Sequence, residues 1–199
     1  MNIVMSTTRK LTTPNIRTKA ARPYLEFKVM VANGFGSFSR LIFPGKTQLI
    51  NEAPKDTSEN FTPTDEWPEK LCQGSLNCKV TEFPDNFQEA VGDGQGIGAF
   101  DNGLYTPAFS IPHDMIGGNQ FGPTSENPRK GIGQVWDCTV TKHHSTADNQ
   151  FSAWHLRRVV GNTSGYLDVI ELVSDRRLRE AHALETGMEM TLKMHLGGK

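Results

Sequence analysis

The sequence predicts a mainly β protein, built as a small closed barrel of six or seven strands with one or two short helices. The first observation behind this fold class is a series of short, evenly spaced segments in which apolar and polar residues alternate. The second is composition, because 19 glycines and an apolar fraction of 36% suit strands with irregular connections better than a helical bundle. Closing such a sheet into a barrel also removes exposed strand edges.

The N-terminal half is expected to contribute three strands. Apolar residues alternate along 24–31, which predicts a half-buried strand. The Asn-Gly-Phe-Gly-Ser sequence at 33–37 indicates a turn that uses the backbone freedom of glycine, and 38–43 is expected to return as a strand. The polar residues 44–68 predict a surface loop, and 74–80 alternates again.

The middle of the chain is expected to hold a long insertion followed by a hairpin. Residues 84–130 are rich in Gly, Asn, Asp and Pro, and within them 103–112 is expected to pack as a short strand or folded loop. Strands at 134–140 and 151–160 flank a polar turn at 143–149, as in a hairpin.

The C-terminal segment predicts a strand–helix–turn–strand unit. A strand at 167–173 is followed by Ser174, which we expect to cap a short helix at 175–184. Gly187 then makes a turn, and alternating residues at 188–196 form the last strand.

Length and composition indicate one domain at 23–199, preceded by a flexible tail at 1–22. The 22 acidic and 21 basic residues nearly cancel, so we expect no nucleic-acid partner. No run of about 18 apolar residues occurs, so no membrane span is expected. The odd number of cysteines, without a Cys-x-x-Cys pair, suggests buried small side chains in a cytoplasmic protein: Cys72, Cys78 and Cys138.

The glycine turn is a candidate nucleotide- and phosphate-binding element, formed by Gly34, Gly36 and Ser37. A glycine-rich strand–turn–strand exposes backbone N–H groups that can hold phosphates. The alternative is an ordinary tight hairpin turn. The pattern matches neither the P-loop nor the dinucleotide fingerprint.

Ser75 and Asn77 are candidate metal ligands. They lie two residues apart on a predicted strand, so they project from the same face. A hydroxyl and an amide carbonyl are hard oxygen donors that can hold a hydrated Mg²⁺. The alternative is a solvated strand face.

Three weaker groups complete the candidates. His143, His144 and Asp148 could form a metal site. Asp101, His113 and Asp114 could be acid–base groups. Arg157 and Arg158 could bind an anion.

In this order, the motifs resemble those of the archaeal CTP-dependent riboflavin kinases. Residues 34–38 resemble the family's glycine loop, and 74–80 resembles its Gly-Thr-Leu-Asn strand. The strand at 168–173, the Leu-Arg-Glu at 178–180 and the Gly187 turn resemble its C-terminal unit. The resemblance covers about two-thirds of the chain, in pieces, and implies a cradle-loop barrel.

The resemblance implies a Mg²⁺-dependent phosphotransferase that takes phosphate from a nucleoside triphosphate to a small-molecule hydroxyl, riboflavin if the family chemistry is kept. Ser75 and Asn77 then take the places of the family's metal-binding Thr and Asn. The proton acceptor is left open between three carboxylates: Asp137, Asp168 and Glu171.

A second interpretation is a non-catalytic barrel that binds a small ligand or a protein. Phe38 favours it, because this side chain stands where the family has a third loop glycine. A third is unrelated chemistry in a site built from the long insertion and the barrel mouth.

Overall fold

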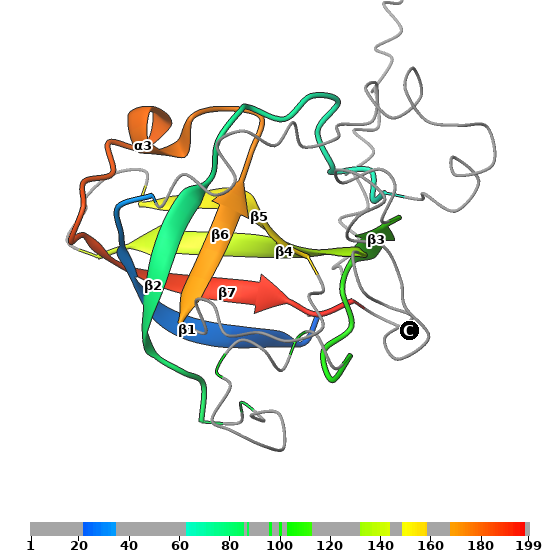
Figure 1. The fold of residues 1–199 in the computed structure, drawn as a ribbon. Helices are drawn as coiled ribbons and strands as arrows, with labels where there is room; N and C mark the ends of the chain where they lie inside the picture. Colours follow the sequence, from blue (N-terminus) through cyan, green and yellow to red (C-terminus); the bar gives the residue numbers. More distant parts are fainter. Residues whose placement is uncertain are drawn as a thin grey trace, which may run out of the picture.

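The described part of the chain forms an antiparallel β-barrel with one short helix (Figure 1). The computed structural model describes residues 22–34, 63–85, 87, 96, 100, 103–112, 132–143, 149–158 and 168–197. The elements within these ranges are β1 (Tyr24–Val31), β2 (Leu76–Glu82), β3 (Phe109–Ile111), β4 (Gly133–Lys142), β5 (Gln150–Arg158), β6 (Val169–Val173), α3 (Leu178–Ala181) and β7 (Glu189–His195).

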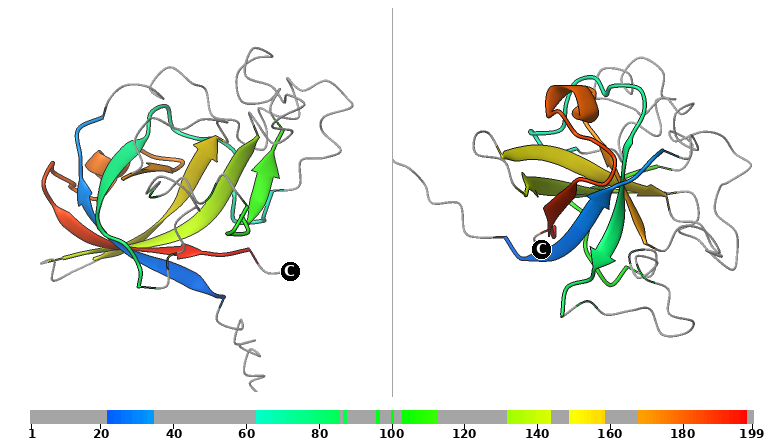
Figure 2. Two further views of the ribbon diagram at one scale, coloured as in Figure 1. Left: turned by 60° about the horizontal axis from the view of Figure 1, so that its bottom comes forward. Right: turned by 90° about the vertical axis from the view of Figure 1, so that its left-hand side faces the viewer.

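Six of the strands close on themselves, which confirms the predicted barrel. The order β4-β5-β6-β2-β1-β7 is completed by a ladder between β7 and β4, and every pairing is antiparallel. The seventh strand, β3, pairs with the first part of β4, beyond the point where β7 ends. The views of Figure 2 show the strands curving around the barrel, with α3 over one end.

The interior is filled by the apolar face of each alternating strand. Leu25, Phe27, Val29 and Val31 of β1 are all buried, as the alternation of 24–31 predicts. Together with the inward residues of the other barrel strands they form one continuous core. The fully buried inward residues of β4, β6, β2 and β7 include Trp136, Cys138, Val140, Ile170, Leu172, Cys78, Met190, Leu192 and Met194.

A second apolar cluster covers part of the outside of the barrel wall. Trp67 lies there at 1% exposure, in edge-to-face contact with Phe109 (5.0 Å between ring centroids) and Trp154 (5.2 Å). Residues 63–72, expected to be surface loop up to Pro68, therefore pack on the outer faces of β3 and β5.

Three aromatic residues of the long insertion, Phe87, Phe100 and Tyr105, pack in the barrel core. Phe100 is fully buried between Phe27, Trp136 and Tyr105, and Phe87 stacks on Tyr105 at 5.4 Å. The strand expected within 103–112 is β3. The insertion thus supplies aromatic side chains that fill the barrel interior.

Most predicted strands are confirmed, with shifts of at most two residues at their ends. Residues 24–31 match β1, and the predicted hairpin is the β4–β5 pair. The strand expected at 38–43 and the tail at 1–21 lie outside the described residues. In the described part of the chain, no helix has the length and apolar character needed to cross a membrane.

The predicted C-terminal helix is much shorter than 175–184, and the expected cap at Ser174 is wrong. The helix begins after Arg177, whose backbone is extended and whose side chain makes no capping bond. The Ser174 hydroxyl instead donates to the Asp175 carboxylate, and the Ser174 carbonyl accepts the Cys72 N–H at 2.8 Å. The backbone at Ser174 therefore bonds to the segment before β2, and the helix starts only after Arg177.

Two backbone positions near this helix allow a stability prediction. Ala183 has a φ of 50°, which is unfavourable for a side chain, whereas Gly187 has a φ of 90° that favours glycine. Ala183→Gly should therefore stabilise the protein by about 0.5–1 kcal/mol, and Gly187→Ala should destabilise it by about 1 kcal/mol or more. Urea denaturation measures both effects. Gly34→Ala is the control, because a Cβ there meets nothing within 4 Å and its φ is not positive; equal effects at Gly34 and Gly187 would contradict the backbone explanation.

Candidate functional site

The pairing of β2 with β6 brings a predicted site residue opposite a carboxylate. Asn77 on β2 is the register partner of Glu171 on β6. Their neighbours Leu76, Cys78 and Leu172 point into the core, so both polar side chains project from the outer face of the wall. This antiparallel ladder therefore places an amide beside a carboxyl group at one end of the barrel.

Ser75 joins this pair from the residue just before β2. Its hydroxyl lies 3.5 Å from the Oδ1 of Asn77, as expected for two side chains on one face. It also donates a hydrogen bond to the carboxyl group of Glu171. Asn77 is only 5% exposed, so the pair does not belong to an ordinary solvated strand face.

The environment of Glu171 makes it a titratable group near neutral pH. Burial raises the pKa of Glu171 to about 7, against the lowering effects of the Ser75 hydrogen bond and the positive charge of Arg157. A half-buried carboxyl group of this kind can exchange a proton near pH 7. Such shifted groups occur at functional sites, although structural networks also produce them.

Of the three carboxylates that the sequence left open, Glu171 is the one that the register places beside Asn77. Asp168 pairs with Lys79 at 3.7 Å, and both side chains are about half exposed. Asp137 lies on β4, opposite His195 and Trp154, on another part of the wall. Glu171 is the one that lies across from Asn77 and accepts the Ser75 hydrogen bond.

The start of the glycine turn is held beside this group. The Ala32 N–H donates to the carbonyl of Asn77 at 2.9 Å, and the Arg179 guanidinium donates to the Ala32 carbonyl at 2.6 Å. Gly34 follows two residues later, and its φ does not require glycine. The other two phosphate-binding candidates, Gly36 and Ser37, lie outside the described residues.

A cavity of about 220 Å³ opens between the start of β2 and α3. Ser75 belongs to its lining and so connects it to the Asn77–Glu171 pair. Its other residues include Gly74, Leu178, Arg176, Arg177 and Arg179. Arg176 pairs with Asp175 and Arg177 with Glu180, so part of this positive charge is already balanced. The arginines give the cavity a basic wall.

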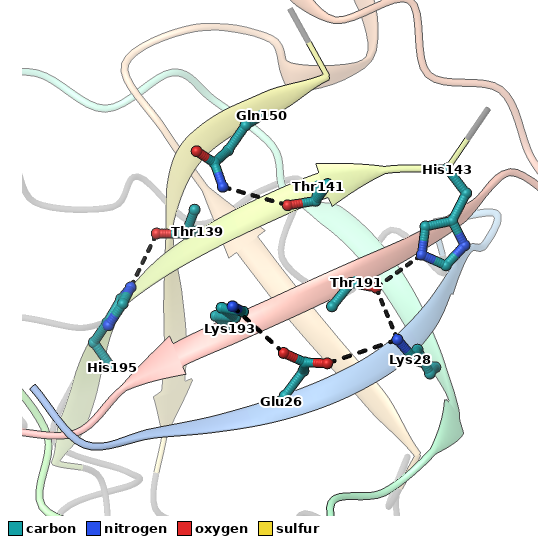
Figure 3. Close-up of polar contacts among 9 residues, drawn as sticks. All are labelled: Glu26, Lys28, Thr139, Thr141, His143, Gln150, Thr191, Lys193 and His195. Carbon is teal, nitrogen blue, oxygen red and sulfur yellow. Dashed lines mark hydrogen bonds and ion pairs between the residues drawn. The ribbon is translucent and has the colours of Figure 1, made fainter. Parts of the chain in front are cut away.

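His143 belongs to a polar network on a different face of the barrel. Figure 3 shows this network on the outer faces of β1, β7, β4 and the start of β5. The His143 Nε2 lies 2.7 Å from the Thr191 hydroxyl, and its Nδ1 lies 3.9 Å from a Glu189 oxygen. Lys28 likewise contacts Thr191 (3.2 Å) and Glu26 (3.7 Å). Among the described residues, no group of three or more His, Cys, Asp or Glu side chains is placed to hold a metal ion.

Several other sequence candidates fall where the structure gives no side-chain description. These are Asp101, His113, Asp114, His144, Asp148 and the side chain of Arg158. Arg157 is described and lies close enough to lower the pKa of Glu171.

All three cysteines are free thiols. Cys78 and Cys138 are fully buried in the core, as the sequence suggests, and burial raises the pKa of both thiols, that of Cys78 to about 12. Cys72 is half-buried. The two core thiols therefore act as small apolar side chains.

Arg179 is a residue that the sequence analysis did not identify as part of the site. It holds the end of β1 against α3 and lines the cavity beside Ser75. Nothing in its local pattern distinguishes it from the neighbouring Arg176 and Arg177, because the carbonyl it contacts is 147 residues away in sequence.

Comparison with known proteins assigns the chain to no family. No protein-family model matches the chain, and no curated protein sequence matches it. The resemblance to the CTP-dependent riboflavin kinases therefore stays a prediction from the motifs.

The raised pKa of Glu171 predicts a pH-dependent gain in stability from Glu171→Gln. Between about pH 4.5 and 7 the folded state binds this proton more tightly than the unfolded state, so the contribution of Glu171 to stability is lost as pH rises through that range. Above pH 7 the half-buried carboxylate opposes folding. Glu171→Gln should then be about 1–2 kcal/mol more stable than wild type, with no such gain below pH 4.5.

Denaturant unfolding at pH 4 and pH 8 measures this difference. The pKa of His155 is lowered to about 4, mainly by burial, so its contribution to the free energy of unfolding rises with pH. This contribution is the same in wild type and Glu171→Gln, so it cancels when the two proteins are compared. Glu82→Gln, at an exposed position of β2, is the matched control. A gain for Glu171→Gln that is the same at both pH values would contradict the shifted pKa.

Proposed function

We propose that the chain transfers a phosphoryl group from a nucleoside triphosphate to the hydroxyl of a small molecule, with Mg²⁺, in the manner of a riboflavin kinase. The observation that carries this proposal is the convergence of Ser75, Asn77 and Glu171, with the start of the glycine turn held beside them. Hard oxygen ligands, a proton acceptor and a phosphate-binding backbone are the parts that such a transfer requires.

The donor set fits a magnesium ion. Two ligands at right angles and about 2.1 Å from Mg²⁺ lie about 3 Å apart. The Ser75 hydroxyl and the Asn77 carbonyl oxygen are 3.5 Å apart, so a small adjustment brings both onto one ion. When bound, Mg²⁺ supplies charge neutralisation to the phosphates.

Glu171 is the proposed proton acceptor. In the transfer, the acceptor hydroxyl oxygen bonds to the terminal phosphorus, and the bond from that phosphorus to the bridging oxygen breaks to release the nucleoside diphosphate. The hydroxyl proton passes to the carboxylate of Glu171, whose pKa of about 7 suits a base at neutral pH. Positioning and charge neutralisation supply most of the acceleration.

The non-catalytic alternative has one observation in its favour. The cavity beside Ser75 has a volume of about 220 Å³. Pockets for drug-sized ligands are usually about 300–1,000 Å³. A barrel that binds a smaller ligand or a protein therefore remains the second candidate.

Thermal unfolding with nucleotides tests the proposal. A nucleoside triphosphate plus Mg²⁺, at a concentration about 100 times its Kd, should stabilise the native state by about 2.7 kcal/mol. For a chain of this size that corresponds to a rise in Tm of roughly 5–10 °C. Ser75→Ala should remove the part of the rise that depends on Mg²⁺, whereas Ser152→Ala, on the outer face of β5, should leave it unchanged.

Gly34→Ala adds a test of the glycine turn, because the site of the new methyl group is open in the fold. It should weaken nucleotide binding without lowering the stability of the ligand-free protein. The proposal is wrong if no nucleotide raises Tm. An effect of equal size with and without Mg²⁺ contradicts the metal role of Ser75 and Asn77.

The base role of Glu171 predicts the pH dependence of turnover. With nucleotide and riboflavin, kcat should rise with pH along an acid limb whose midpoint lies near 7, because only the carboxylate accepts the proton. Glu171→Gln should lower kcat by roughly 10²–10⁴-fold. Direct assay of phosphorylated product across pH 5–9 measures this, and a limb that persists in Glu171→Gln would assign the base to another group.

A further inference from the structure

His155 lies inside the barrel, directly behind Glu171. Its side chain is 2% exposed and stacks on Trp136, with 5.5 Å between ring centroids and an interplanar angle of 24°. Phe100 meets the same ring edge-on at 6.0 Å. Burial is the main reason that the pKa of His155 falls to about 4, so the imidazole is neutral at pH 7.

In the described part of the chain, the polar contact of this ring reaches the backbone of the proposed base. The His155 Nδ1 lies 3.0 Å from the carbonyl oxygen of Glu171. Because a carbonyl only accepts, Nδ1 carries the hydrogen and Nε2 is the unprotonated nitrogen. In the described part of the chain Nε2 is buried without a hydrogen-bond partner, so Nδ1 is the atom that anchors the ring.

This contact lies where the pairing of β5 with β6 ends. The two strands pair at Trp154↔Val173 and His155↔Leu172, and Glu171 is the next residue of β6. The His155 side chain therefore continues the connection of β5 to β6 by one further hydrogen bond, made from inside the barrel.

We propose that His155 is a positioning residue, which holds the Glu171 peptide so that its carboxyl group faces Ser75 and Asn77 on the other side of the wall. The rings of Trp136 and Phe100 fix the imidazole, and the imidazole fixes the carbonyl. Loss of this hydrogen bond shortens the connection between β5 and β6, so the segment of β6 that carries Glu171, and the carboxyl group with it, can shift away from Ser75 and Asn77. This inference rests on the proposed function only for the role of Glu171 as a base.

Neighbouring strands supply the polar groups near Glu171. Arg157 on β5 lowers its pKa, while Ser75, just before β2, donates a hydrogen bond to it. Asn77 on β2 is its register partner. Movement of the Glu171 carboxyl group in a His155 variant therefore shows as a loss of its proximity to Ser75 and Asn77.

Two substitutions separate the hydrogen bond from the packing of the ring. His155→Leu fills the apolar space but has no donor. His155→Asn fills it less well, yet its amide nitrogen lies where Nδ1 was. If packing alone matters, the leucine variant should resemble wild type more closely; if the hydrogen bond matters, the asparagine variant should.

The measurement is the set of NMR proximity contacts between the Glu171 side chain and the side chains of Ser75 and Asn77, in the full chain without nucleotide or Mg²⁺. In His155→Leu these contacts should be lost, and in His155→Asn they should persist as in wild type. Unchanged contacts in His155→Leu, or an equal loss in both variants, overturns the proposal.

A second measurement on wild type covers the case in which neither variant folds. Scalar coupling between the His155 Nδ1 and the carbonyl carbon of Glu171 should be detectable, and its absence, or a proton on Nε2 instead, overturns the proposal. Neither measurement uses nucleotide, so a failed nucleotide-binding test rejects the proposed function and leaves this inference standing. If turnover is found, kcat should follow the order wild type, His155→Asn, His155→Leu.

Discussion

The ladder between β4 and β7 is the interaction on which the rest of the structure depends. It runs from Asp137↔His195 to Lys142↔Met190 and turns an open sheet into a barrel. Closure gives the strands an interior to which all of them contribute, and the alternating apolar residues fill it. It also fixes which side chains face outward, and so which polar groups can meet on the wall. The insertion residues Phe87, Phe100 and Tyr105 complete this interior.

The two polar regions of the wall differ in how their groups are satisfied. On β1, β7 and β4, side chains such as Lys28, Thr191 and Glu26 bond or pair with one another, half-exposed to solvent (Figure 3). At the β2–β6 ladder, Asn77 is almost fully buried and Glu171 carries a raised pKa. A carboxyl group held in this way opposes folding at neutral pH, whereas exposed ion pairs contribute little in either direction. The β2–β6 region thus carries the buried polar groups and shifted pKa that mark a candidate site, whereas the other region carries the exposed pairs of an ordinary outer face.

The wall of the barrel connects its interior to that site. On β6, Ile170 and Leu172 pack inward, and Glu171 between them points outward with its carbonyl bonded to His155. The core residues Ile170 and Leu172 are therefore the chain neighbours of Glu171, and the buried His155 is joined to it by one hydrogen bond. The basic cavity beside α3 and the end of β1, tied together by Arg179, adjoin the same region. The helix α3 lies over the end of the barrel where β1 ends and β2 begins (Figure 2), and the cavity and Arg179 lie beside it.

The strands could be predicted from the sequence alone, because the alternation of residues along 24–31 or 188–196 is local and has one buried face. The closed barrel was predicted only as a fold class, from the number and even spacing of these strands. The sequence also determined that Ser75 and Asn77 share a face, since that follows from their spacing alone. The length of the helix was overestimated because Ser174 does not cap it. The Ser174 hydroxyl bonds to the neighbouring Asp175 side chain, and the Ser174 carbonyl accepts from Cys72, which is distant in sequence. Only the tertiary structure placed Glu171, rather than Asp137 or Asp168, beside Ser75 and Asn77, with His155 behind it. Register and closure pair residues that lie far apart along the chain, and no local pattern encodes which strands become neighbours.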